Sequence, residues 1–347
     1  MKIAYIVNHL EQTGLNNVVL DLITKMQEHG HTCDLYYLKD VQNAMSFPCE
    51  VKKLDRSSKT TLTSYDIVHT HGLRPDAFVF LHRPFKTKTK FIATIHCYVF
   101  QDFCDLFGKV KGFLLGLIFL LTLLRHDKIV TLSKDAMKYY SRWLPKHKLT
   151  YAYNTRILEK EDLSEEERNE ILAFKQDSVL IGMNCVLILR KGIDVMLKAL
   201  ALLPNNYKLF IAGSGKEAQT FQDMAKQLGM EERVFFAGTK HKAYRYLPYY
   251  DIYALPSRSE GFPLSLLEAA DYGKKVVCSS LPIVKECFTD DELKIFDMPN
   301  EHALAETIKE ITNNQQIGNC LKQKFDECYS PECFYQRYLE IYENVLK

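Results

Sequence analysis

The sequence lacks several patterns that would place it in a specialised class of protein. It holds ten cysteines but no C-x-x-C pair and no cysteine–histidine set with zinc-finger spacing, which argues against a structural zinc site. Disulfide frameworks are typical of short secreted chains, so we expect reduced, mostly buried thiols and a cytoplasmic protein. No internal repeat at solenoid spacing and no low-complexity tract is present.

An excess of charge of one sign is also missing. The net charge of +2 argues against a polycation that binds nucleic acid, and 47% apolar with 25% charged residues is typical of globular proteins. This balance hides an asymmetry, because residues 1–155 carry 21 basic and 13 acidic side chains, or +8, which leaves −6 for the remainder. The length of 347 residues, at roughly 100–200 residues per domain, predicts about two domains, and the charge division predicts different partners for them.

No apolar run is long enough to cross a bilayer, which takes ~20 residues. The run Met1–Val7 is too short for a signal peptide, and residues 113–124 form an uncharged stretch of twelve. Side chains that can carry positive charge flank this stretch: Lys109, Lys111, Arg125, His126 and Lys128. Two interpretations remain open, a buried core helix or a peripheral helix through which residues 109–128 contact an anionic membrane.

Short apolar runs alternate with helical patterns in both parts of the chain, which predicts parallel α/β sheets. The predicted strands of the first part are Lys2–Val7, Thr32–Leu38, Asp66–His71, Lys90–His96 and Lys128–Leu132. Those of the second part are Val179–Met183, Lys208–Ala212, Val234–Phe236, Ile252–Leu255, Lys275–Cys278 and Leu293–Phe296.

We therefore predict two doubly wound, Rossmann-like domains, 1–155 and 178–330. Residues 156–177 are expected to form the linker plus a surface helix, for which Ser164–Glu167 offers a capping box. A helix over 331–347 is expected to cross back to the first domain. Two such domains would face each other across a cleft at the carboxyl ends of their strands, where ligands bind in these folds.

The densest set of polar residues follows the predicted strand Ile252–Leu255. Glu260 lies in a loop, and Glu268 lies about one turn inside a helix predicted over Leu264–Tyr272, with Gly273 at its end. The loop backbone and the helix dipole make an anion site, and two carboxylates beside it suit the hydroxyls of a sugar diphosphate. The residues expected at this site are Gly261, Phe262, Pro263, Leu264 and Ser265. An ordinary helix cap with surface acids would give the same pattern.

Two more loops of the second domain carry candidate residues. Arg190 and Lys191 follow its first strand and could bind a diphosphate, although two cations on a loop are also typical of solvated surface. The pattern from Gly213 to Ala218 fits G-x-G-x-x-A, the dinucleotide fingerprint. It follows the second strand of its domain rather than the first, so we favour a tight turn beside a phosphate cleft over an NAD(P) site.

The first domain offers a glycine and three histidines. Gly14 follows the first strand, where it permits close backbone approach. His69 and His71 lie on one face of a predicted strand end, and His96 ends the next strand. Three histidines raise the possibility of a metal site, but no acid is placed with them. We favour a structural role for His69 and His71 and expect His96 to face the cleft.

Taken together, these residues resemble the retaining glycosyltransferase family 4 of the GT-B superfamily. The pair Glu260/Glu268 with its E-x7-E spacing is the most specific match, and Lys191–Gly192, Gly213-x-Gly215 and Thr94–His96 support it. The resemblance implies a hexosyltransferase that uses a nucleotide-diphosphate sugar, with UDP favoured, and needs no metal or cofactor; no D-x-D motif is present. It also implies a glycan or polyprenyl- or lipid-linked acceptor, in surface polysaccharide or glycolipid synthesis at the inner membrane face.

The resemblance further implies roles for single residues. Glu260, His96 and Lys191 would be catalytic: Glu260 and His96 contact the donor sugar, and Lys191, with Arg190, the diphosphate. Gly14 and the amides of Phe262–Ser265 would help to bind the diphosphate, and Glu268 the ribose. The family's arginine is replaced by Val186, and its Gly-Gly loop reads Thr13–Gly14. An epimerase of the same superfamily and a catalytically silent partner subunit are the alternatives.

Overall fold

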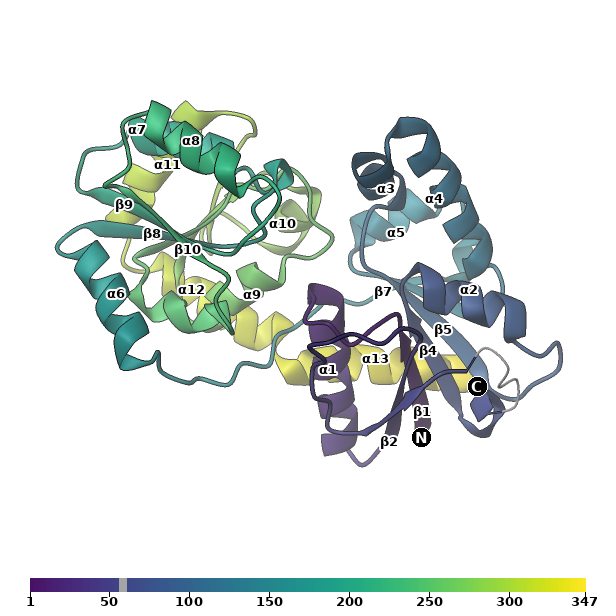
Figure 1. Ribbon diagram of the computed structural model, residues 1–347. Helices are drawn as coiled ribbons and strands as arrows, with labels where there is room; N and C mark the ends of the chain where they lie inside the picture. Colours follow the sequence, from purple (N-terminus) through teal and green to yellow (C-terminus); the bar gives the residue numbers. More distant parts are fainter. Residues whose placement is uncertain (56–60) are drawn as a thin grey trace. The chain divides into compact units, whose positions relative to one another are not determined.

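The structure, a computed structural model, describes residues 1–55 and 61–347. The chain divides into two compact units, the first made of Met1–Ile157 and Tyr329–Lys347 and the second of Leu158–Cys328 (Figure 1). Each unit contains one parallel sheet with helices on its faces, so the predicted fold of two Rossmann-like α/β domains is confirmed. The surface helix expected within residues 156–177 is present as α6 (Glu165–Lys175), with the Ser164–Glu167 capping box, and most residues of the expected linker belong to the second unit.

Within the described residues, the sheet of the first unit has seven strands in the order β3-β2-β1-β4-β5-β6-β7. Their bounds are β1 (Lys2–Val7), β2 (Thr32–Tyr37), β3 (Glu50–Lys53), β4 (Ile67–His71), β5 (Lys90–Ile95), β6 (Lys128–Thr131) and β7 (Leu149–Tyr151). The edge strands β3 and β7 were not predicted, because they are short and β3 carries three charged side chains in four residues.

The helices of the first unit include the chain's C-terminal segment. They are α1 (Gly14–Glu28), α2 (Leu73–His82), α3 (Val99–Phe107), α4 (Lys109–Leu123), α5 (Lys134–Tyr140) and α13 (Pro331–Leu346), with 3₁₀ turns η1 (Thr61–Ser64) and η2 (Lys146–Lys148). Thr13 caps α1 by accepting a hydrogen bond from the Asn16 amide, and Ser133 caps α5 in the same way through Ala136.

The helix α13 belongs to the core of the first unit. Tyr338 and Tyr342 are fully buried, and the hydroxyl of Tyr342 lies 3.3 Å from that of Tyr5 on β1. The same hydroxyl lies 2.7 Å from Nδ1 of His69 on β4. The last 19 residues of the chain therefore complete the domain that the first 157 residues begin.

Within the part of the chain that the structure describes, the second sheet has six strands in the order β10-β9-β8-β11-β12-β13. Their bounds are β8 (Val179–Asn184), β9 (Tyr207–Ala212), β10 (Val234–Gly238), β11 (Ile252–Leu255), β12 (Lys275–Ser279) and β13 (Lys294–Phe296). The helices are α6 (Glu165–Lys175), α7 (Ile193–Ala201), α8 (Ala218–Gln227), α9 (Leu264–Asp271), α10 (Pro282–Cys287), α11 (Glu301–Thr312) and α12 (Ile317–Lys324), with shorter turns η3 (Leu189–Lys191), η4 (Ala243–Tyr249) and η5 (Phe325–Tyr329).

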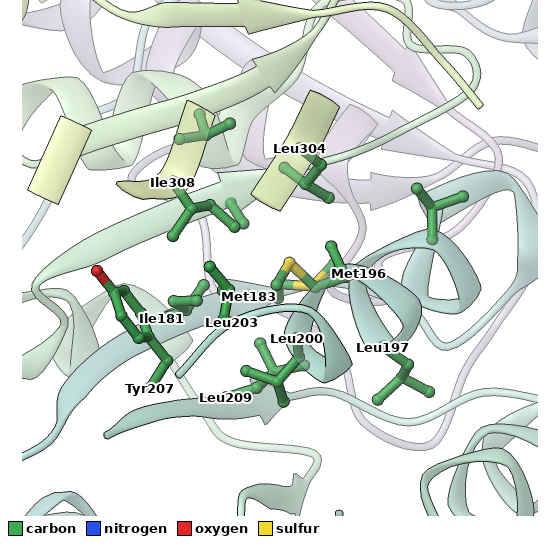
Figure 2. Packing of buried hydrophobic residues seen from close by; sticks show 14 of the residues in the cluster. Ile181, Met183, Met196, Leu197, Leu200, Leu203, Tyr207, Leu209, Leu304 and Ile308 are labelled. Carbon is green, nitrogen blue, oxygen red and sulfur yellow. The ribbon is translucent and has the colours of Figure 1, made fainter. Parts of the chain in front are cut away.

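The core of the second unit lies between its central strands and two helices. Figure 2 shows Ile181 and Met183 of β8 packed with Met196 of α7 and with Leu304 and Ile308 of α11. Because both faces of a parallel sheet are covered by helices, such strands are apolar throughout, which is why the sequence identified them correctly.

Candidate functional site

Strand order places the candidate loops of the second unit beside one another. Its first strand, β8, lies at the centre, with β9 and β10 on one side and β11 to β13 on the other. The order therefore reverses between β8 and β11, and ligands of such sheets bind at this switch point, outside the carboxyl ends of the strands. The loop after β8 carries Arg190 and Lys191, and the loop after β11 carries Glu260.

Lys191 and Glu260 meet at this point. Nζ of Lys191 donates to Oε1 of Glu260 over 2.6 Å, and Oγ of Ser257 donates to the same oxygen over 2.7 Å. Nη1 of Arg190 lies 3.8 Å from the other carboxylate oxygen and donates to the carbonyl of Ser259 over 2.9 Å. The Glu260 side chain is only 9% exposed, so its carboxylate is held in one orientation by three neighbouring side chains.

A glycine and an ion pair hold the two loops together. Gly192 has φ +70°, and a Cβ there would overlap the carbonyl of Pro256, so the approach of the loops requires glycine. The guanidinium of Arg258 pairs with both carboxylate oxygens of Asp194, at 2.8 and 2.7 Å. The amide of Arg258 also donates to the carbonyl of Arg190 over 2.8 Å. These contacts hold the loop after β8 and the loop after β11 together without a ligand.

The helix α9 begins beside this cluster. Its N-cap is Pro263, which makes no side-chain capping bond. Because proline has no N–H, the expectation that Pro263 donates to an anion is wrong. Leu264 and Ser265 supply the first amides of α9, while the Leu266 amide donates to the carbonyl of Pro263 over 3.1 Å. Gly261 and Phe262 lie in the preceding loop. The helix end keeps backbone donors and a favourable dipole for an anion.

Glu268 is the fifth residue of α9 and is half-buried. It lies near Tyr253 of β11, whose pKa burial raises, partly offset by a hydrogen bond with Ser265. Glu260 and Glu268 therefore lie on the two sides of the α9 N-terminus, one in the loop before it and one in its second turn.

The glycines of the G-x-G-x-x-A pattern serve the packing of loops. Gly213 and Gly215 follow β9, and a Cβ on either would overlap backbone atoms of the loop after β8, at Cys185 or Leu187. The Leu187 amide donates to the carbonyl of Ser214 over 2.9 Å. Packing against the neighbouring loop accounts for both glycines without a dinucleotide, and it places Gly213 behind the loop that carries Lys191.

Val186 occupies the place of the expected family arginine, and its side chain is 55% exposed on the loop after β8. Arg190, four residues later, points toward Glu260 instead. The cluster of Arg190, Lys191 and Glu260 therefore has a net charge of +1, which suits a diphosphate.

The first unit has its own switch point, between β1 and β4. Gly14 is the first residue of α1, directly after the loop that follows β1. The buried Asn16 amide group fixes that loop by donating to the carbonyls of His9 and Glu11 over 2.8 and 2.7 Å. Gly72, after β4, has φ +98° and lies against Leu15 at the start of α1.

Two of the three histidines form a hydrogen-bonded pair. Nδ1 of His71, the last residue of β4, lies 2.9 Å from Nε2 of His96, which directly follows β5. The ring of His69 is bonded on both sides, to Tyr342 and, over 2.8 Å, to Thr94. Its structural role argues against the three-histidine metal site, and in the described part of the chain no cluster of His, Cys, Asp or Glu is arranged to hold a metal ion.

Burial keeps these histidines neutral. It lowers the pKa of His96 to about 4 and holds the pKa values of His69 and His71 well below the ordinary value. Burial also raises the pKa of the Cys185 thiol to about 12, so this thiol near Lys191 and Glu260 stays protonated and is a poor nucleophile.

Two cavities lie at opposite ends of their strands, one at amino ends and one at carboxyl ends. One of about 470 Å³ lies at the amino ends of β8 and β11, against Lys274, and contains no predicted site residue. Another of about 500 Å³ lies at the carboxyl ends of β1 and β2 in the first unit. It is lined by Asn8, Leu38, Lys39, Arg74, Ala77, Phe78, Leu81 and His82.

Several residues of the site escaped the sequence analysis. Ser257, which holds Glu260, and the pair Asp194–Arg258 are common residue types in loops, and only the approach of two loops gives them a role. His71 was expected to be structural, and its bond to His96 depends on strand register. The ends of adjacent parallel strands were a usable signal for this last contact.

This geometry agrees with comparisons to known proteins. The model of the family "Glycosyl transferases group 1" matches residues 164–327. The O-antigen biosynthesis glycosyltransferase WclY of Escherichia coli is 33% identical over 99% of this chain and 98% of its own length. Among solved structures, Anabaena HepE in complex with UDP and glucose has a TM-score of 0.83 at 15% identity, over 99% of this chain and 100% of that one. WaaG, a lipopolysaccharide glycosyltransferase, has a TM-score of 0.73 at 15% identity, over 98% and 99%.

The fold and the comparisons define a glycosyltransferase with the GT-B architecture. More particularly, the chain belongs to the group 1 glycosyltransferases.

Proposed function

We propose that the protein is a retaining, metal-independent glycosyltransferase of family 4 that transfers a sugar from UDP-sugar to a glycan during synthesis of a surface polysaccharide such as O-antigen. The single observation that carries this proposal is the Lys191–Glu260 contact at the switch point of the second sheet, beside the N-terminus of α9. The similarity to WclY and WaaG, which act in O-antigen and lipopolysaccharide biosynthesis, supports a role in surface polysaccharide synthesis. The similarity to HepE, whose structure contains UDP and glucose, supports a UDP-sugar donor.

The diphosphate of the donor binds to the positive side of this cluster. Lys191 supplies a point charge, Arg190 supplies paired donors, and the amides of Leu264 and Ser265 add the helix N-terminus. As the bond between the sugar and the phosphate breaks, negative charge grows on the leaving phosphate oxygen. Fixed positive groups stabilise that charge without a metal ion.

The carboxylates bind the uncharged parts of the donor. Glu260, oriented by Lys191 and Ser257, accepts hydrogen bonds from hydroxyls of the transferred sugar. Glu268 accepts from the ribose hydroxyls. His96 of the first unit, neutral through burial, is bonded to His71 through Nε2, so Nδ1 is the ring atom left to donate to or accept from the sugar.

Retention is proposed to follow attack on the same face of the sugar as the leaving group. The C1–O bond to the phosphate breaks, the acceptor oxygen bonds to C1, and the acceptor's proton passes to the leaving phosphate. The protonated thiol of Cys185 offers no competing nucleophile.

The cavity at the ends of β1 and β2 is our candidate for the acceptor. Lys39 and Arg74 give it two cations, and Leu38, Phe78 and Leu81 give it apolar walls. This mixture suits a polyprenyl-diphosphate-linked glycan, which carries both an anionic group and a hydrocarbon chain. An acceptor of this kind places the enzyme at the cytoplasmic face of a membrane.

A nucleotide-sugar screen tests the donor assignment. A ligand that binds only the folded state raises the melting temperature, and we expect UDP and one or more UDP-sugars to do so without added metal. Proton NMR of the glycosidic product then gives the anomeric configuration. An inverted product or a strict need for a divalent metal ion contradicts the proposal. Conversion of the donor alone to its epimer, without acceptor, would identify an epimerase.

A further inference from the structure

The helix α4 is apolar on all sides, but only half of its surface is used by the fold. Its inner side packs closely on α3, because a Cβ at Gly112 or Gly116 would overlap Phe103 or Phe100. Phe119, Leu120 and Leu123 complete the buried side. The segment 113–124 is therefore a core helix on this side, as one of the two sequence interpretations expected.

The outer side of α4 is equally apolar and faces away from the fold. Val110, Leu114, Ile118 and Leu121 follow one helical stripe, and each is between 51% and 78% exposed. The last two residues of α3, Leu106 and Phe107, are also exposed and extend this apolar surface. We call these six residues the α3–α4 surface; α3 and α4 lie side by side in Figure 1. Helices that are apolar all round are normally covered by protein or lipid.

Most charges around this surface are positive, although the exposed Asp105 directly precedes Leu106 on α3. Lys109 and Lys111 are exposed at the N-terminal end of α4, and Arg125 follows its C-terminal end. No aspartate or glutamate occurs between residues 106 and 126. The stems of such cations lie along apolar surface while their charges reach anionic headgroups.

The sole tryptophan of the chain borders this surface. Trp143 is 46% exposed, and its ring lies 4.9 Å from that of Phe100. Phe100 in turn stacks at 5.1 Å on Phe113 of α4. Tryptophan favours the boundary between hydrocarbon and water.

We propose that the α3–α4 surface docks on an anionic lipid bilayer, with the apolar stripe of α4 lying in the headgroup region and Lys109 and Lys111 on the phosphates. Among the helices of residues 1–55 and 61–347, none combines the length and the apolar character that a membrane span requires. The lysines of α4, together with the lack of acidic residues over 106–126, favour anionic lipid over a partner protein, whose interface would bury these lysines. Docking needs neither donor nor acceptor, so its failure leaves the proposed function untouched.

Trp143 allows a direct test with the unlabelled full chain. Vesicles of equal parts phosphatidylcholine and phosphatidylglycerol are expected to shift its emission to the blue, and brominated lipids are expected to quench it. Vesicles of phosphatidylcholine alone are expected to bind at least about tenfold more weakly, because the electrostatic attraction is lost. Vesicle flotation measures the same partition independently.

Matched variants distinguish binding through the α3–α4 surface from non-specific binding to vesicles. Leu114→Asp with Ile118→Asp is expected to lower binding at least about tenfold, whereas Leu172→Asp, a comparably exposed leucine on α6, leaves it unchanged. Lys109→Glu with Lys111→Glu is expected to weaken binding to anionic vesicles only, and Lys226→Glu on α8 is its control.

Because all these positions are exposed, melting temperatures should stay close to that of the parent protein. Equal vesicle binding by the parent and the aspartate double variant overturns the proposal. Lack of binding of the parent protein to anionic vesicles would also overturn it. A third contradicting result is a parent protein that forms a homodimer and does not bind vesicles, if the aspartate double variant is monomeric.

Discussion

His71 and His96 share a hydrogen bond of 2.9 Å at the carboxyl ends of neighbouring strands of the first sheet. Both rings are neutral, because burial lowers their pKa values, so one ring donates and the other accepts. Among the described residues, Nε2 of the buried His71 has no hydrogen-bond partner. An unsatisfied buried polar atom costs about 1–3 kcal/mol, so this pair is poorly explained by stability and better explained by the orientation of His96.

We therefore predict that His71→Phe lowers kcat about tenfold while the affinity for UDP and the melting temperature change little. Phenylalanine retains the ring but removes the bond that orients His96, and it also removes the unsatisfied nitrogen. Steady-state kinetics, calorimetry with UDP and thermal melts measure the three quantities. An unchanged kcat would mean that the pair is structural. His69→Phe is the contrasting variant, because it breaks two satisfied bonds and should lower the melting temperature instead.

Acid is expected to destabilise the first unit through its buried histidines. The folded pKa values of His69, His71 and His96 lie below the unfolded value of about 6.5. Below pH 6.5 the unfolded chain therefore binds more protons than the folded one, and each histidine removes up to about 1.4 kcal/mol per pH unit until its folded pKa is reached. For His96 this loss spans pH 6.5 to about 4.

Emission of Trp143, which lies in the first unit, follows this effect in thermal melts between pH 6.5 and 5. Another buried pair does not add to the slope. Burial raises the pKa of Asp76 to about 8 and lowers that of His126 to about 3, so the pair holds one proton between pH 4 and 6.5 in both the folded and the unfolded state. A Trp143 melting midpoint that stays constant over pH 6.5 to 5 would contradict neutral, buried histidines.

The sequence predicted the buried parts of the fold better than the contacts between loops. Strand β1 was placed at its observed bounds, because its apolar run is buried on both faces. Strand β3 was missed, because a charged edge strand has no such run. The apolar run of α4 was compatible with a buried core helix or a peripheral membrane helix. In the structure one side of the helix is buried and the other side is exposed.

Long-range contacts explain the rest of what sequence reasoning missed. Arg258 and Asp194 are 64 residues apart, and no local pattern reports their pairing. Gly213 fits a nucleotide-binding motif in sequence, but its environment is the carbonyl of Cys185 in a neighbouring loop. Motif spacing identified the residues of the site, whereas the topology of the sheet decided which of them meet.

Gly192→Ala is predicted to destabilise the second unit by about 2–4 kcal/mol. The positive φ costs a non-glycine residue about 1–2 kcal/mol, and overlap with the Pro256 carbonyl forces the two loops apart at a similar cost. Gly229→Ala is the matched control, because its φ is +65° but nothing lies within 4 Å of the added Cβ. Denaturant unfolding of both variants gives the difference. Equal losses would show that backbone conformation, and not loop packing, requires Gly192.

Substitutions of Glu268 and Glu260 are predicted to affect different steps, donor binding for Glu268 and turnover for Glu260. Glu268→Ala should abolish measurable donor binding in a calorimetric titration, because the ribose loses its acceptor. Glu260→Gln should reduce kcat more than it raises KM, because the charge that orients Lys191 is lost while the shape is kept. Unchanged nucleotide-sugar affinity in Glu268→Ala, or a larger effect of Glu260→Gln on KM, would reverse these assignments.

Arg190 and Val186 are predicted to be coupled in their effect on catalysis. If Arg190 replaces the family's arginine at position 186, Arg190→Ala should lose about 1.5–3 kcal/mol of transition-state stabilisation, or roughly 10- to 150-fold in kcat/KM. Val186→Arg alone should gain little, because Arg190 already supplies the charge. In the Arg190→Ala background, however, Val186→Arg should restore much of the loss, since its exposed side chain starts from the same loop. A double-mutant cycle in kcat/KM measures this coupling. Strictly additive effects would mean that the two positions serve different groups of the substrate, and that Arg190 does not stand in for the missing arginine.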